Sequence, residues 1–217
     1  NKCNIDASLL SMIIHKVDKQ FYSDEWTELC VNLYCSGFLK HEYGYFPQCM
    51  SRYFFRNPDK LLEKIRGDDA LYFEFQWHYR LPSEAFFDIG QLLHWTDVMI
   101  NASDSDADKV TLVGSILGEA PDGDDGIFPI ETVRKLLKIK KNEELTTAVA
   151  RGKINSLGLR DVEDGKKERE KSDIYKMQAR AMEIDYPQTS VILRILANFY
   201  ERESKRDQIS SEIEPLQ

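Results

Sequence analysis

The sequence predicts an all-α protein, an irregular helical array of the α-solenoid-like or bundle kind that ends in an αα-hairpin. Apolar residues recur at helical spacing along most of the chain. Proline, glycine and capping residues stand where that spacing is interrupted. Apolar residues make up 42% and charged residues 30% of the 217 residues, which is the balance of a folded globular protein.

The first two predicted helices occupy the N-terminal stretch. Residues 5–21 place apolar side chains one helical turn apart, with Asp6 positioned to cap the start. Ser23 precedes a second such run, and Gly37 stands near its end. The short turn between the two runs predicts an antiparallel pair.

Four further helices are predicted before residue 101. Asn57-Pro58 divides one helix after Pro47 from the next, because proline suits the first turn of a helix. Residues 71–79 are ambiguous, since their apolar groups alternate as in a half-buried strand but also share helical faces. We predict a helix there, because a lone strand among helices would leave its backbone groups without partners. Pro82 opens the next helix, which should end near Asn101.

An acidic, glycine-rich segment is the predicted boundary between two subdomains. Residues 101–127 carry seven acids against one base, so this stretch alone holds −6 of the net charge of −8. A short helix over residues 110–117 is followed by Pro121 and the Gly/Asp run. We therefore predict an N-terminal helical subdomain at 1–120, an acidic Gly/Asp linker at 121–127 and a C-terminal helical subdomain at 128–217.

The C-terminal subdomain should end in the αα-hairpin. One helix follows Pro129, Asn142 can cap the next, and a charged helix begins at about Lys166. Pro187 stands at the turn before the last helix. The predicted seam joins two apolar rows, which are Ile174, Met177, Ala181 and Ile184 on the first helix and Ile192, Ile195, Leu196 and Phe199 on the second.

The chain lacks the marks of a membrane or secreted protein. No run approaches the roughly 18 apolar residues of a membrane span, and the N-terminus shows no secretory signal. Four cysteines at positions 3, 30, 35 and 49 are too few and too clustered for a disulfide framework. We expect a cytoplasmic protein with no membrane partner, and Asn1 in place of Met indicates a piece of a larger one.

Two constellations have partial metal-ligand spacing. The first offers four soft ligands, but it lacks the short knuckle of a zinc site, so we interpret its cysteines as small buried residues: Cys30, Cys35, His41 and Cys49. The second is acidic, but neither Asp104-x-Asp106-x-Asp108 nor 122–126 has the acid that closes a calcium loop. We therefore predict solvated turns and no metal or other cofactor.

The remaining candidates for chemistry are histidines and lysines. None of the four histidines lies in a catalytic signature, and we expect His78 and His94, each beside a tryptophan, to be half-buried packing residues; the other two are His15 and His41. The most basic stretch could meet phosphates, but acids interrupt it, so a solvated helix end is the preferred interpretation: Lys135, Lys138, Lys140, Lys141, Arg151 and Lys153. No catalytic residue is therefore assigned.

Four segments together resemble a known family: residues 68–80, 123–137, 152–158 and 186–201. They are similar to the helical C-terminal regions of a family of large, uncharacterised bacterial proteins. That family has Trp where Phe128 and Tyr186 stand and Arg where Gln188 stands. The resemblance covers most of residues 50–207 and implies a helical fold and a bacterial origin, but no activity or site residue.

These observations predict a non-catalytic interaction or scaffold module of a larger bacterial protein. Its partner would be a protein, either the upstream part of its own polypeptide or another chain. The alternative is an accessory region of a bacterial stress or phage-defence protein that contacts nucleic acid or a foreign protein. The acidic net charge argues against nucleic acid, and an enzyme with an unrecognised site is the third hypothesis.

Overall fold

The computed structural model describes residues 14, 16, 23–35, 47–66, 69–101, 106–157 and 165–213. All regular elements within these residues are helices, and they cover more than half of the chain. The predicted all-α class is therefore confirmed, and residues 71–79 are helical up to His78. Of the helix expected over residues 5–21, the structure describes Ile14 and Lys16, which are helical, and the rest lies outside the described residues.

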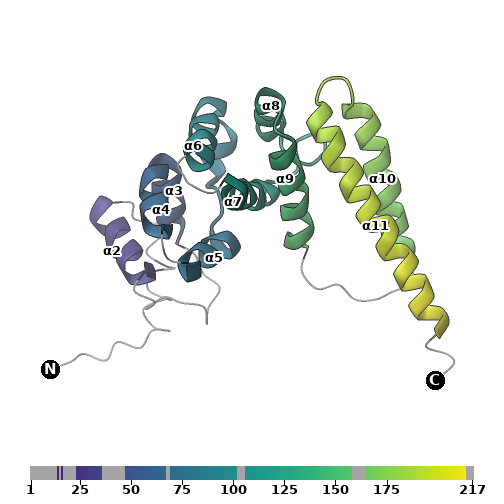
Figure 1. The fold of residues 1–217 in the computed structure, drawn as a ribbon, viewed down its shortest axis with the longest axis horizontal. Helices are drawn as coiled ribbons and strands as arrows, with labels where there is room; N and C mark the ends of the chain where they lie inside the picture. Colours follow the sequence, from purple (N-terminus) through teal and green to yellow (C-terminus); the bar gives the residue numbers. More distant parts are fainter. Residues whose placement is uncertain are drawn as a thin grey trace. The chain divides into compact units, whose positions relative to one another are not determined.

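The chain forms two compact units, an N-terminal unit at Asn1–Ser103 and a C-terminal unit at Asp104–Gln217. The described helices of the N-terminal unit are α2 (Asp24–Cys35), α3 (Gln48–Arg56), α4 (Pro58–Ile65), α5 (Asp69–His78), the 3₁₀ helix η1 (Ser83–Phe86) and α6 (Ile89–Asn101). Figure 1 labels the α-helices among them.

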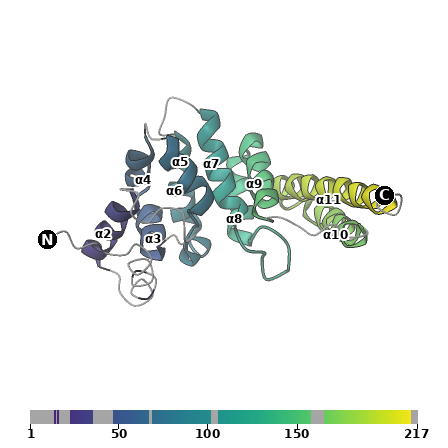
Figure 2. The same cartoon turned by 90° about the horizontal axis from the view of Figure 1, so that it is seen from below.

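The described helices of the C-terminal unit can be followed in Figure 2. They are α7 (Asp106–Gly118), α8 (Glu131–Lys140), α9 (Glu143–Ser156), α10 (Lys166–Met182) and α11 (Pro187–Ile213). The last two lie side by side and form the predicted αα-hairpin.

Side-chain caps fix several helix starts where the sequence placed them. Ser23 Oγ accepts a hydrogen bond of 3.1 Å from Trp26 N, and Asn142 Oδ1 accepts one of 2.9 Å from Leu145 N. The single helix predicted from Pro82 to Asn101 is wrong in one respect, because it is divided into η1 and α6. Asp88 causes the division, since its Oδ1 accepts a 3.0 Å bond from Gln91 N and so starts a new helix.

The predicted linker at 121–127 is also wrong. The boundary between the units falls after Ser103, and residues 121–127 lie inside the C-terminal unit. The buried guanidinium of Arg134 binds both carboxylate oxygens of Asp125 at 2.6 and 2.7 Å and the carbonyl oxygen of Pro129 at 2.5 Å. The carbonyl of Ile127 accepts a further bond from Arg134. An arginine outside the segment thus holds it against α8.

The core of the N-terminal unit is aromatic. The buried ring of Phe75 on α5 lies 5.8 Å from Tyr34, 5.3 Å from Phe54 and 6.2 Å from Tyr79. Tyr79 also stacks on Trp95, and its hydroxyl donates to the carbonyl of Ser51 at 3.2 Å. Complete burial raises the pKa of Tyr79, so this hydroxyl stays a neutral donor. Rings from α2, α3, α5 and α6 therefore join most of the unit.

The core of the C-terminal unit depends on close contact between α7 and α9. A Cβ on Gly114 would lie 2.2 Å from Ala148 Cβ, and a Cβ on Gly118 would lie 2.6 Å from the backbone of Gly152. Small residues four apart on one helix thus face small residues four apart on the other. Glycine permits this approach because it has no side chain between the two backbones.

Candidate interaction surface

In the hairpin, α10 and α11 pack against each other through a row of small residues, which we call the seam. Three serine hydroxyls cross the seam to backbone carbonyls: Ser172 to Ala197 at 3.0 Å, Ser190 to Ala179 at 2.8 Å and Ser204 to Gly165 at 2.7 Å. On each helix these positions are seven residues apart, as in a coiled coil. The seam therefore consists of small residues repeated every seven positions on each helix, and their size lets the two backbones approach closely.

Gly165 shows how tight this approach is. It has φ of 73° at the start of α10, and a Cβ there would lie 2.4 Å from the carbonyl oxygen of Ser204. Only glycine meets both requirements, since side chains rarely adopt a positive φ and none fits the space. Between the small layers, Tyr175 stacks on Tyr200 with ring centroids 5.7 Å apart.

The predicted apolar seam of α10 is wrong, although the hairpin itself is confirmed. Ile174, Met177 and Ile184 are 49%, 64% and 91% exposed, and Ala181 is exposed as well. Ile174, Met177 and Ala181 stand on the outer face of α10, opposite the small residues, and Ile184 lies in the turn after the helix. Of the predicted α11 row, Ile192 and Leu196 are buried, whereas Ile195 and Phe199 are only half-buried. The sequence does carry a signal for the buried face, which is a small residue at every seventh position of each helix. These residues are Gly165, Ser172 and Ala179 on the first helix and Ser190, Ala197 and Ser204 on the second.

The outer face of α10 is the candidate interaction surface. We define the α10 stripe as Ile174, Met177 and Ala181, whose spacing of three and four residues matches one face of a helix, together with Ile184 in the turn that follows α10. The rest of α10 is rich in charged residues, so the stripe is a row and not a scatter of single apolar groups. Rows of exposed apolar side chains mark sites of protein association.

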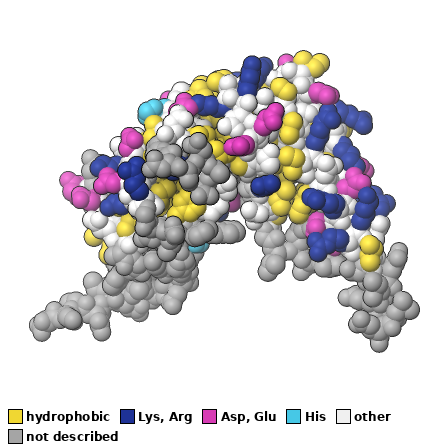
Figure 3. Space-filling model, viewed as in Figure 1, with side chains coloured by type: hydrophobic (Ala, Val, Ile, Leu, Met, Phe, Trp, Pro, Cys, Tyr) yellow, Lys and Arg dark blue, Asp and Glu magenta, His cyan; other side chains and the backbone are white. Residues whose placement is uncertain are grey.

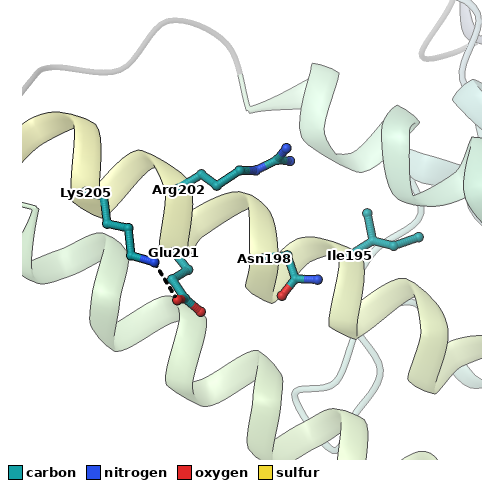
Figure 4. Close-up of a pocket in the computed structure, with 5 residues that line it drawn as sticks. All are labelled: Ile195, Asn198, Glu201, Arg202 and Lys205. Carbon is teal, nitrogen blue, oxygen red and sulfur yellow. Dashed lines mark hydrogen bonds and ion pairs between the residues drawn. The ribbon is translucent and has the colours of Figure 1, made fainter.

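The hairpin has a shallow pocket on α11, and Figure 4 shows its lining. Glu201 pairs with Lys176 at 2.8 Å and with Lys205 at 3.0 Å, and these cations lower the pKa of its carboxyl to about 2. The side chain of Arg202 points away from the Glu201–Lys205 pair. An ionised carboxylate between two lysines can hold the hairpin together, but it cannot donate a proton near neutral pH. The remaining lining residues are Ile195 and Asn198.

The cysteines of the partial zinc pattern are packing residues where the structure describes them. Cys30 on α2 and Cys49 on α3 are buried, and Cys35 is half-buried. His41 and Cys3 lie outside the described residues. Within the described part of the chain, no three residues of the His, Cys, Asp and Glu types come together as metal ligands would.

The acidic residues of the second pattern serve the fold where they can be followed. Asp125 is bound by Arg134, which lowers the pKa of its carboxyl to about 2. Asp122 lies 3.9 Å from Lys153, whose ammonium lies 4.4 Å from the centre of the Phe128 ring. Asp104 falls outside the described residues, and Asp106 begins α7.

The histidines do not form a site. His78 is half-buried at the end of α5, as expected. The expectation for His94 is wrong, because its side chain is exposed on α6 while the neighbouring Trp95 is buried. His15 and His41 lie outside the described residues.

Several members of the basic stretch are engaged within the C-terminal unit. Lys135 pairs with Glu131 at 3.0 Å, and the ammonium of Lys138 lies 5.4 Å from the centre of the Tyr186 ring. Arg151 lines a shallow hollow beside Glu143 and Glu144. Lys140 and Lys141 end α8, and Lys141 adopts a positive φ of 51°. In the view of Figure 3, Lys and Arg side chains lie over α10 and α11 with Asp and Glu side chains among them.

Comparisons with known proteins give no family. No family model matches the chain, and no curated protein or solved structure is similar enough to match it. Among the described helices, none combines the length and the apolar character needed to cross a membrane.

Proposed function

We propose that the chain is a non-catalytic interaction module of a larger bacterial protein, and that it binds a protein partner through the α10 stripe. The observation that carries this proposal is the exposure of Ile174 and Met177 on the outer face of α10 and of Ile184 in the turn after it, while the inner face of α10 packs against α11. The bacterial origin in this proposal comes from the resemblance to the helical C-terminal regions of large bacterial proteins.

The burial of α10 gives the physical reason for a partner. Its inner face uses glycine, serine and alanine, so its large aliphatic side chains contribute little to the stability of the hairpin. Each exposed aliphatic side chain would gain about 1.5–3 kcal/mol on full burial. A helix groove or a second helix could supply that burial.

The electrostatics of the described residues support binding over catalysis. The carboxyls with the lowest pKa values, Asp125 and Glu201, are held ionised by neighbouring cations within the fold. Catalytic acids near neutral pH need the opposite shift.

Site-specific photo-crosslinking tests the proposal. A photoreactive amino acid at Met177, in the full-length protein within its own cells, should give adducts with a defined polypeptide that mass spectrometry can identify. The same group at Arg206, which is exposed on α11 of the same hairpin, is the matched control. Ile174→Glu combined with the Met177 probe should abolish the adduct. Equal yields at both positions would overturn the proposal.

A salt titration separates this function from the nucleic-acid alternative. Phosphate binding weakens steeply with salt, whereas an apolar contact does not. We expect no appreciable binding to DNA or RNA at physiological salt. A salt-sensitive complex that is lost on charge reversal of Lys138, Lys140 and Lys141 would favour the alternative.

A further inference from the structure

We infer that the pocket on α11 binds an acidic segment of a protein partner. One Asp or Glu carboxylate of that segment pairs with Arg202, and an aliphatic side chain of the segment lies on Ile195. The contact is separate from the α10 stripe, because it uses the other helix of the hairpin. It therefore goes beyond the proposed function and assigns a second binding surface with a defined chemistry.

The first argument is that Arg202 has no partner of its own. Its guanidinium is exposed and makes no hydrogen bond, ion pair or ring contact within the described part of the chain. Arg194 of the same helix pairs with Glu183 at 2.9 Å. Arg206 pairs with Glu203 at 3.0 Å. Of these three arginines of α11, Arg202 is the one whose guanidinium is open to an anion from outside.

The second argument is the balance of charge around the pocket. The Glu201 carboxylate lies 2.8 Å from the Lys176 ammonium and 3.0 Å from the Lys205 ammonium. Asp173 lies 3.9 Å from the same Lys176. Two lysines are thus matched by two carboxylates, and Arg202 remains as one unmatched positive charge. An anionic group with a single charge is the electrostatic complement of this arrangement.

The third argument is the order of groups along the pocket. Ile195, Asn198 and Arg202 stand on successive turns of α11, since they are three and four residues apart. Figure 4 shows the Arg202 side chain pointing away from the pair of Glu201 and Lys205. The pocket therefore presents an aliphatic group, an amide and an unpaired guanidinium in one row. A guanidinium binds a carboxylate through two parallel N–H donors, and an amide can donate one more.

The shape of the pocket favours a side chain of a larger partner over a free small molecule. The pocket has a volume of about 440 Å³, and its described lining comes from α11 alone. It therefore covers one side of a ligand, whereas small-molecule sites bury most of the ligand surface. A side chain that projects from a partner protein needs no such enclosure, because the rest of the partner covers its other side.

The charges also favour an acidic peptide over a nucleic acid. Proteins that bind nucleic acid neutralise several phosphates along the backbone. On α11, however, carboxylates already pair with the other cations and would repel neighbouring phosphates: Glu183, Glu201 and Glu203. A peptide brings one carboxylate with apolar side chains beside it, which matches Arg202 beside Ile195.

Titration of the isotope-labelled whole chain with blocked tripeptides, followed by nuclear magnetic resonance, tests the inference. Acetyl-Leu-Glu-Leu-amide should shift the backbone signals of Ile195, Asn198 and Arg202, with a dissociation constant between about 1 and about 10 mM. Acetyl-Leu-Gln-Leu-amide, which lacks the charge, should bind at least about fivefold more weakly. Acetyl-Ser-Glu-Ser-amide should also bind more weakly, because it has no aliphatic side chain for Ile195. Unshifted signals at the highest peptide concentration would overturn the inference.

A matched pair of variants assigns the binding to the unpaired guanidinium. Arg202→Gln should weaken binding of acetyl-Leu-Glu-Leu-amide by at least about fivefold, because it removes the unmatched cation. Arg206 is paired with Glu203 and does not line the pocket, so Arg206→Gln should change the binding by less than about twofold. Equal losses in the two variants would mean that only the overall charge matters, and the site would be refuted.

Inorganic phosphate and a single-stranded DNA oligonucleotide serve as competing probes. We expect both to bind more weakly than acetyl-Leu-Glu-Leu-amide at physiological salt. Phosphate that shifts the same signals at the same concentration would indicate an unselective anion site in place of a site for an acidic segment. Tighter binding of the oligonucleotide, lost in Arg202→Gln, would make nucleic acid the partner and overturn the inference. None of these results bears on the α10 stripe, which the Met177 crosslink tests separately.

Discussion

In the N-terminal unit, Phe75 is surrounded by the rings of Tyr34, Phe54 and Tyr79, whereas in the C-terminal unit the tightest contacts join residues without large side chains. The N-terminal unit holds 19 of the 24 aromatic residues and all three tryptophans. The C-terminal unit instead brings Gly118 against Gly152 and Gly165 against Ser204. The two units therefore use different means to join helices.

This difference indicates which kind of substitution should destabilise each unit most. Aromatic packing gains from the area that each ring buries, so removal of a ring is costly. Small-residue packing gains from backbone proximity, so addition of a single carbon is costly. Small-residue packing also leaves large aliphatic side chains outside the core, and for this reason the α10 stripe is available to a partner.

The largest effect is expected from the removal of a ring in the N-terminal unit. Phe75→Ala should lower the free energy of unfolding of this unit by about 3–5 kcal/mol, because it leaves a cavity among rings. Tryptophan fluorescence during urea unfolding reports this unit alone, since all tryptophans lie in it. Phe87→Ala, at an 85% exposed position, should change the value by no more than about 0.5 kcal/mol. Equal midpoints for the two variants would contradict an aromatic core.

The next effect comes from the addition of one carbon to the C-terminal unit. Alanine normally stabilises a helix over glycine by about 1 kcal/mol. A Cβ at Gly152, however, would lie 2.7 Å from the carbonyl oxygen of Gly114 and 2.8 Å from Ser115 Cα. Gly152→Ala should therefore destabilise the unit by about 2–3 kcal/mol, measured by far-ultraviolet circular dichroism. Gly90→Ala is the control, since its nearest neighbour is the Asp88 carboxylate at 3.3 Å; a stabilised Gly152→Ala would refute the close packing.

A matched pair on α10 distinguishes its two faces. Ala179 is 2% exposed in the small-residue seam, whereas Ala181 is exposed in the stripe. Ala179→Leu should cost about 1–3 kcal/mol by overpacking, and Ala181→Leu no more than about 0.5 kcal/mol. Thermal melts of the two variants measure the difference. A larger loss of stability for Ala181→Leu than for Ala179→Leu would mean that the apolar row predicted from the sequence packs against α11.

The smallest effect is electrostatic and appears only in acid. Arg134 lowers the pKa of Asp125 from 3.8 to about 2 in the folded chain. The ion pair therefore contributes stability above pH 3.8, and the contribution is lost as the pH falls towards about 2. Because the carboxylate is half exposed, we expect no more than about 1 kcal/mol. Asp125→Asn should flatten this part of the stability profile, whereas Asp124→Asn in the same loop should retain its slope.

Local signals made much of the fold predictable. Ser23, Pro58 and Asn142 stand at helix starts because a cap or a fixed φ acts within one turn of the chain. The hairpin was also predictable, since two adjacent helices joined by a short turn run antiparallel. The linker was not, because Arg134, whose side chain orders residues 121–127, lies outside that segment.

The sequence by itself determined that α10 is a helix with two rows at helical spacing, one aliphatic and one small. Transfer of apolar area from water favours burial of the aliphatic row, and this is why the sequence alone indicated the wrong face. In the tertiary structure, the row of small residues is buried instead. Burying the row of Gly165, Ser172 and Ala179 brings two backbones close enough for serine hydroxyls to reach carbonyls across the seam. These contacts form only when the two helices lie close together, and the sequence of either helix alone does not determine the distance between them.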